Sequence, residues 1–171
     1  MAYDRIASRL MGMNEKVWAS HANPLSGWTR LATAPLWFCA LWSVHWIGWW
    51  SLITIVPLCL WTWLNPRIFP PPADDRAWMT RGVLGERIFC RRDEFDIPAE
   101  HVRFAHILTF FAFISLIGAV WGLLSGRFWP ALGGWLLMIT FKLWFIDRMA
   151  WLYHTMKETG AAVGSIGAAH R

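Results

Sequence analysis

Hydrophobic positions in this chain form long uninterrupted runs rather than an alternating pattern. No charged residue occurs from Leu31 to Leu64, and none occurs from Phe104 to Gly126. Apolar runs of about 18 residues or more predict transmembrane helices, because a helix of that length crosses the hydrocarbon core of a bilayer. The pattern therefore predicts an all-α, polytopic membrane protein.

The first apolar run is too long for a single ordinary span, because a helix rises only about 1.5 Å per residue and the hydrocarbon core is about 30 Å thick. Two short spans fit it better, at about residues 31–47 and 49–64. Gly48 lies between them, among Trp46, Trp49 and Trp50, and tryptophan favours the membrane–water interface. Each span is near the lower length limit, so a re-entrant hairpin that does not cross the membrane stays open as an alternative.

The second half of the chain predicts two further spans, at about residues 104–124 and 129–146, joined by a short turn. Residues 3–18 place apolar side chains at helical spacing beside basic ones, which predicts an amphipathic helix on the membrane surface. The expected fold is thus four transmembrane helices, arranged as two hairpins, plus an N-terminal interfacial helix. Residues 1–158 would form a single membrane domain, with a loop over 65–103 and a disordered tail over 159–171.

Basic residues set the expected orientation. Of the 16 Lys and Arg residues, all but Arg127 fall on the side that holds both termini and the central loop. The positive-inside rule places that side in the cytoplasm. We therefore expect a multi-pass protein of the cytoplasmic (inner) membrane with both termini inside. Lys142 is the one Lys, Arg, Asp or Glu within a predicted span, and no other charge is expected at its depth.

Composition adds few constraints on partners. The chain holds 15 tryptophans, which suits a membrane protein, and it has no block of like charges that would indicate nucleic-acid binding. Its three cysteines do not suggest a disulfide framework. The expected partner is the lipid bilayer, with a second copy or another membrane subunit as alternatives. No cofactor is predicted.

Polar side chains gather near the cytoplasmic ends of the predicted spans. The structural interpretation is that Asn23 and Pro24 start a turn and that Arg30 reaches lipid phosphates. The functional interpretation makes His21 a ligand or an acid–base group. The Glu86-Arg87 and Asp147-Arg148 pairs are expected to cross-pair. The full candidate cluster is His21, Asn23, Arg30, Asn65, Arg67, Glu86, Arg87, Asp147, Arg148 and His154.

The last predicted helix carries Asp147, Trp151, His154 and Glu158 on one face. Such an acidic and histidine-bearing face could contribute to a divalent metal site if His21 joined it from another helix. The same spacing is typical of a solvated helix end. No metal site is therefore predicted, and His21, Asp147 and His154 are the candidates to examine.

Four ordered motifs carry a family resemblance. They are WxxHxNPxSxWTR at residues 18–30, NPRxFPPP at 65–72, AWMTRGVLGER at 77–87 and DRMAWLY at 147–153. Together they resemble DUF6653, a family of small bacterial and archaeal membrane proteins of unknown function, over about residues 14–157. The resemblance implies a shared membrane fold and polar motifs that recur together. It implies no activity, substrate or catalytic residue.

Three function classes stay open. The favoured one is a non-enzymatic scaffold, accessory subunit or small-ligand or lipid-binding protein, because no complete catalytic set is evident. The second is an interfacial enzyme acting on a lipid or quinone-like amphiphile, with His21, Glu86, Asp147 and His154 as its polar core. Its Arg30, Arg67, Arg87 and Arg148 would hold an anionic headgroup. The third is an oligomeric transporter or channel, which the nearly uncharged spans disfavour.

Overall fold

A computed structural model describes residues 15–160, and over this range the chain is all-α. The predicted amphipathic helix at 3–18 and the predicted tail at 159–171 lie largely outside these residues. The elements are α2 Glu15–His21, α3 Pro24–Ala32, α4 Ala34–Trp42, α5 Val44–Ile47, the 3-10 helix η1 Gly48–Ser51, α6 Leu52–Ile68, α7 Trp78–Cys90, α8 Ala99–Leu124 and α9 Phe128–Glu158.

Three helical segments are long and apolar enough to cross a membrane: Pro24–Ile68, Ala99–Leu124 and Phe128–Glu158. Their surface carries large apolar side chains in the open, such as Trp49 at 86% exposed, Leu124 at 80% and Trp129 at 77%. Soluble monomers rarely expose apolar patches on this scale, whereas lipid contact requires them. The helices therefore have the surface of a membrane protein.

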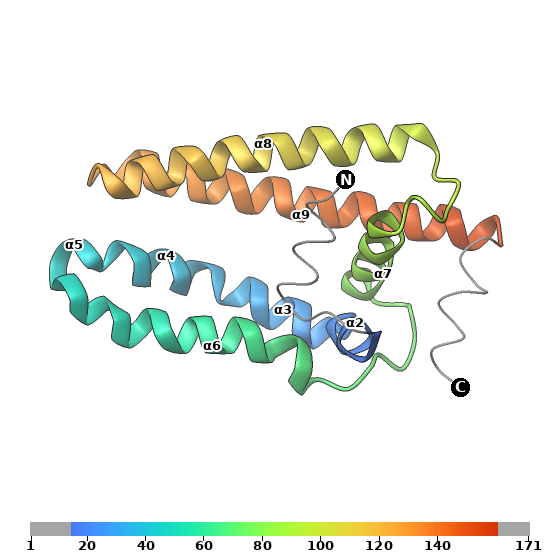
Figure 1. The fold of residues 1–171 in the computed structure, drawn as a ribbon, viewed down its shortest axis with the longest axis horizontal. Helices are drawn as coiled ribbons and strands as arrows, with labels where there is room; N and C mark the ends of the chain where they lie inside the picture. Colours follow the sequence, from blue (N-terminus) through green and yellow to red (C-terminus); the bar gives the residue numbers. More distant parts are fainter. Residues whose placement is uncertain (1–14, 161–171) are drawn as a thin grey trace.

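The first segment turns back on itself. The chain runs out through α3 and α4, reverses at α5 and η1, and returns along α6 (Figure 1). Gly48 begins η1 with a φ of 53°, a left-handed conformation that glycine adopts without steric cost. Pro35 lies in the first turn of α4, where the missing N–H has no helical partner to lose.

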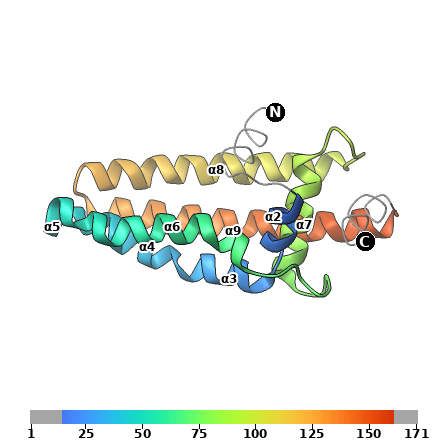
Figure 2. The same cartoon turned by 60° about the horizontal axis from the view of Figure 1, so that its bottom comes forward.

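Helices α8 and α9 run side by side (Figures 1 and 2). Their contact depends on small residues: a Cβ on Gly134 would lie 2.4 Å from the Ala119 backbone nitrogen, and one on Gly122 would lie 2.3 Å from that of Ala131. A Cβ on Gly133, by contrast, would meet nothing within 4 Å. Gly134 thus serves packing within the chain, whereas Gly133 of α9 and Gly118 of α8 face open space.

The buried core lies at one end of the molecule, where α7 crosses α9 steeply (Figures 1 and 2). Gly82 and Gly85 disfavour helix by intrinsic propensity, yet α7 is continuous from Trp78 to Cys90. Both glycines face α9, so their lack of a side chain allows the crossing. The core cluster is Met79, Ile88, Phe89, Ala105, Leu108, Phe145, Ile146, Met149, Leu152, Tyr153 and Met156.

Candidate functional site

Asn23 connects the start of α3 to the segment that follows α6. Its side-chain oxygen caps α3 by accepting a hydrogen bond from the Leu25 backbone N–H at 2.9 Å. Its amide donates to the Pro70 carbonyl oxygen, also at 2.9 Å. A single side chain therefore satisfies a free helix-end donor and holds the segment that follows α6 against the start of α3.

A buried hydrogen-bond relay then connects α3 to α6. The Ser26 hydroxyl donates to Asn65 Oδ1 at 2.7 Å, and Asn65 Nδ2 donates to the Thr29 hydroxyl oxygen at 2.8 Å. Ser26 and Asn65 are fully buried. Buried polar groups cost free energy unless they are paired, so this matched set fixes how α3 and α6 lie relative to each other.

Arg30 extends the relay to His21. Its Nε–H donates to the Ser26 carbonyl oxygen at 3.1 Å, and its Nη1 lies 2.9 Å from a ring nitrogen of His21. Burial, followed by the positive charge of Arg30, lowers the pKa of His21 to about 3. The imidazole is therefore neutral at physiological pH, and its ring nitrogen accepts the hydrogen bond from the guanidinium.

Glu86 of α7 and Lys142 of α9 form an ion pair beside these groups. Lys142 Nζ donates to Glu86 Oε1 at 2.9 Å, and the Glu86 side chain is only 21% exposed. Burial alone would raise the pKa of Glu86, but the charge and hydrogen bond of Lys142, together with the charge of Arg30, hold that pKa below its usual value. Electrostatic coupling also links Glu86 and Lys142 to His21.

These four groups are called the polar cluster below: His21, Arg30, Glu86 and Lys142. With His21 neutral, two cations face one carboxylate. Sequence reasoning missed Lys142 as a site residue because its partner comes from the central loop. The signal that could have found it is general: an ionisable side chain within a span requires a counter-charge.

The expected cross-pairing of Glu86-Arg87 with Asp147-Arg148 is wrong. Glu86 pairs with Lys142, while Asp147 accepts a hydrogen bond from Trp78 Nε1 at 3.0 Å. Arg148 instead lies over the Trp151 ring, 4.6 Å from its centroid. The central loop is still attached to the last helix, but by the Glu86–Lys142 and Trp78–Asp147 contacts and not by the expected ion pairs.

The remaining candidates lie elsewhere. Arg67 stacks on the Trp63 ring at 4.1 Å, one turn back along α6. Arg87 is buried on α7. His154 pairs with Glu158 at 3.4 Å on the exposed end of α9. The structure thus brings His21, Asn23, Arg30, Asn65 and Glu86 into one region, whereas Asp147, Arg148 and His154 have their partners elsewhere.

An apolar groove of about 650 Å³ begins at the Glu86–Lys142 pair and continues between α8 and α9. Apart from that pair, His106 and Thr109, its lining is apolar: Leu108, Phe110, Ala112, Phe113, Leu116, Met138, Phe141 and Phe145. This volume lies within the range of roughly 300–1,000 Å³ that small-molecule sites occupy. The groove therefore joins a charged end to a long apolar one.

The family can be decided by comparison with known proteins. A family model, described as a family of unknown function, matches residues 2–170 of the chain. The chain belongs to DUF6653. Searches of the curated proteins and of the solved structures find no match. The resemblance carried by the four sequence motifs is thereby confirmed, while the function of the DUF6653 chain must be argued from its own residues.

Metal binding in the DUF6653 chain finds no support among residues 15–160, where no three His, Cys, Asp or Glu side chains are grouped so that they could hold an ion. The candidates His21, Asp147 and His154 each have another partner: Arg30, Trp78 and Glu158. The four residues considered as the polar core of an interfacial enzyme do not lie together either. His21 and Glu86 lie in the polar cluster, whereas Asp147 and His154 do not.

Proposed function

We propose that this DUF6653 chain is a non-enzymatic, four-span protein of the inner membrane that binds an anionic lipid. Both termini and the central loop would lie in the cytoplasm. The observation that carries the lipid proposal is the Glu86–Lys142 pair at one end of the apolar groove. The topology rests on separate observations, so the two parts are tested separately.

The reversal at Gly48 supports two crossings within the first apolar segment. The return helix α6 has 17 residues, which correspond to about 26 Å at about 1.5 Å per residue, close to the thickness of the hydrocarbon core. Trp49 and Trp50 are both exposed at the reversal, where an interface would place them. Arg67 and the polar cluster lie toward the other end of this helix pair, consistent with a cytoplasmic side.

Cysteine labelling in intact cells tests the topology. In a variant without Cys39, Cys59 and Cys90, we expect a membrane-impermeant maleimide to label Trp49→Cys and Ser125→Cys from outside. We expect it to label Asp96→Cys only after the cells are opened. Labelling of Ser125→Cys without Trp49→Cys would favour the re-entrant alternative, and labelling of Asp96→Cys in intact cells would reverse the proposed orientation.

The end of the groove offers hydrogen-bond donors. An ammonium group has three N–H donors, and Lys142 uses one of them on Glu86. Among the described residues no hydrogen-bond acceptor takes the other two, although the ammonium also lies 4.8 Å from the Phe145 ring centroid. An oxygen of a lipid headgroup can accept from these donors while the acyl chain lies along the groove.

Charge favours an anionic headgroup over a zwitterionic one. The polar cluster holds two cations, Arg30 and Lys142, against the single carboxylate of Glu86. Because the Glu86 side chain is only 21% exposed, charges beside it interact at a lower effective dielectric than at an open surface. A carboxylate or phosphate oxygen at this point would complete the balance and form charge-assisted hydrogen bonds.

Native mass spectrometry of the purified full chain with added phosphatidylglycerol or phosphatidylcholine tests the lipid proposal. We expect phosphatidylglycerol to bind more tightly. Ala112→Trp fills the groove with an indole ring and should weaken that binding by about tenfold or more, equivalent to about 1.4 kcal/mol.

The matched control is Ile117→Trp. Ile117 is an exposed residue of the same helix and does not line the groove. The Ile117→Trp substitution adds the same ring to the lipid-facing surface and should leave phosphatidylglycerol binding unchanged. Equal binding of the two lipids by the unmodified chain would contradict the proposal, as would equal binding by the two tryptophan variants.

A further inference from the structure

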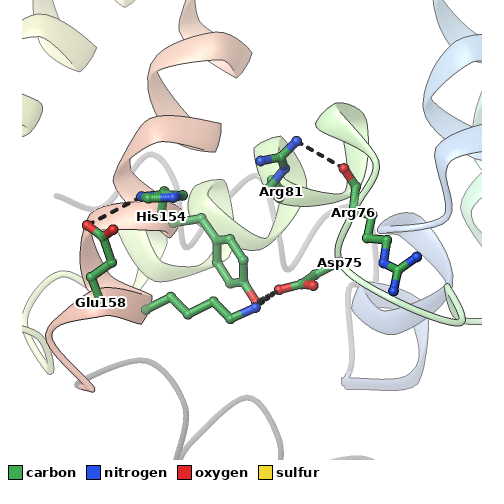
Figure 3. Close-up of a pocket in the computed structure, with 7 residues that line it drawn as sticks. Asp75, Arg76, Arg81, His154 and Glu158 are labelled. Atoms are coloured by element: carbon green, nitrogen blue, oxygen red, sulfur yellow. Dashed lines mark hydrogen bonds and ion pairs between the residues drawn. The ribbon is translucent and has the colours of Figure 1, made fainter.

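Figure 3 shows a second cavity, of about 600 Å³. It lies at the C-terminal end of α9. It is formed by the last turns of α9, the first half of α7 and the segment that precedes α7. In contrast to the apolar groove between α8 and α9, this cavity has only polar or charged residues around it: Asp75, Arg76, Arg81, Tyr153, His154, Lys157 and Glu158.

The acidic groups of this cavity are already engaged. Asp75 accepts hydrogen bonds from the Tyr153 hydroxyl at 2.9 Å and from the Lys157 ammonium group. The hydrogen bond from Lys157, supported by that from Tyr153, keeps the pKa of Asp75 below its usual value despite partial burial. Glu158 faces His154 at 3.4 Å. Asp75 therefore holds Lys157 in place at the cavity wall.

The two arginines have no carboxylate partner inside the cavity. Arg81 donates one N–H, from Nη2, to the Arg76 carbonyl oxygen at 2.9 Å (Figure 3). The Arg81 Nε–H is buried and has no partner among the described residues. The Arg76 side chain is 90% exposed, with Asp74 outside the cavity at 3.6 Å. Of the terminal N–H donors of Arg81, only the one from Nη2 has a partner among the described residues, so the others are free to donate to an anionic ligand.

We propose that this cavity binds the phosphate group of a ligand, with Arg81 as its principal contact and Lys157 beside it. A guanidinium presents N–H donors in a planar fork that matches two phosphate oxygens. Asp75 balances Lys157 and Asp74 balances Arg76, whereas Arg81 has no carboxylate partner among the described residues. Its volume exceeds that of phosphate alone, which leaves room for an organic part of the ligand.

The position of the cavity favours a soluble ligand over a lipid headgroup. Lys157 follows Lys142 by about 15 residues of continuous helix, or about 22 Å. With Lys142 near the inner edge of the hydrocarbon core, as the proposed topology has it, this distance exceeds the headgroup layer of about 5–8 Å. The inference shares that topology but does not depend on lipid binding in the groove.

Calorimetric titration of the full chain in phosphatidylcholine nanodiscs with inorganic phosphate, against chloride at matched ionic strength, tests the site. We expect saturable phosphate binding that weakens at least tenfold in Arg81→Gln. Because Arg81→Gln could disturb folding, His154→Glu is the second variant: it adds a negative charge to the cavity from an exposed position. Arg127→Gln, at the opposite end of the molecule, should bind phosphate as the unmodified chain does.

The lipid in the nanodisc distinguishes the two sources of phosphate. Binding of inorganic phosphate that persists in phosphatidic acid nanodiscs supports a soluble ligand. Loss of that binding with phosphatidic acid, but not with phosphatidylglycerol, supports a phosphate monoester headgroup in the same site. Absence of phosphate binding in phosphatidylcholine nanodiscs would overturn the proposal, as would unchanged binding in both Arg81→Gln and His154→Glu.

Discussion

Replacement of Gly85 by alanine is expected to destabilise the protein by about 3 kcal/mol. This is the upper end of the range for an extra carbon group forced into a packed core. A Cβ at this position would lie 1.8 Å from the Met149 carbonyl oxygen and 2.6 Å from its carbonyl carbon. Both are backbone atoms in the middle of α9, so they can move only if the helix bends or α7 shifts away. Either change would open the core, because Met149 is fully buried within it.

The measurement is the midpoint of thermal unfolding in detergent, followed by circular dichroism and by the monodisperse fraction after heating. Gly133→Ala is the matched control, because a Cβ at Gly133 would meet nothing within 4 Å and this residue also lies within a helix. Alanine favours helix by up to about 1 kcal/mol over glycine, so this control should be unchanged or slightly stabilised. Equal midpoints for Gly85→Ala and Gly133→Ala would show that α7 does not pack on α9 as described.

The general class of the fold could be predicted because lipid contact leaves a long signal in the sequence. Apolar runs from Leu31 and from Phe104 are easy to recognise, and the family resemblance agreed with them. The central loop was harder, because α7 carries Gly82 and Gly85, which disfavour helix on intrinsic propensity. These glycines are favourable because α9 packs closely against them, and no pattern of neighbouring residues in the sequence predicts that contact.

In the candidate site, too, contacts between residues close in sequence could be predicted, whereas contacts between distant residues could not. His21, Asn23 and Arg30 are close in sequence, so a turn and two helices suffice to bring them together. The pairing of Glu86 with Lys142 joins residues far apart in the chain and depends on the direction in which α7 crosses α9. Asp147 and His154 share a helix face, but their partners differ: Trp78 at the start of α7 donates to Asp147, and Glu158 of the same helix faces His154.

Glu86→Gln is expected to have the second largest effect, a loss of about 2–3 kcal/mol. Removal of one partner of a desolvated ion pair can cost about 3–5 kcal/mol, and we take a lower figure because Lys142 is partly exposed. The substitution leaves Arg30 and Lys142 as neighbouring cations without a counter-charge. The unfolding midpoint of the variant in detergent measures the loss.

A second substitution separates charge from shape. Glu86→Gln combined with Lys142→Gln removes the cation that was paired with Glu86, although Arg30 remains, and keeps hydrogen-bonding groups at both positions. It should therefore recover much of the stability lost in Glu86→Gln alone. The control is Glu94→Gln, which breaks the exposed pair with Arg91 at 2.6 Å and should cost less than about 1 kcal/mol. If Glu86→Gln proves as mild as Glu94→Gln, the Glu86–Lys142 pair is a solvated surface contact, and the groove loses its charged end. A large loss that the double variant recovers would instead establish a desolvated charge centre beside the groove, which is the condition that selective binding of an anionic lipid requires.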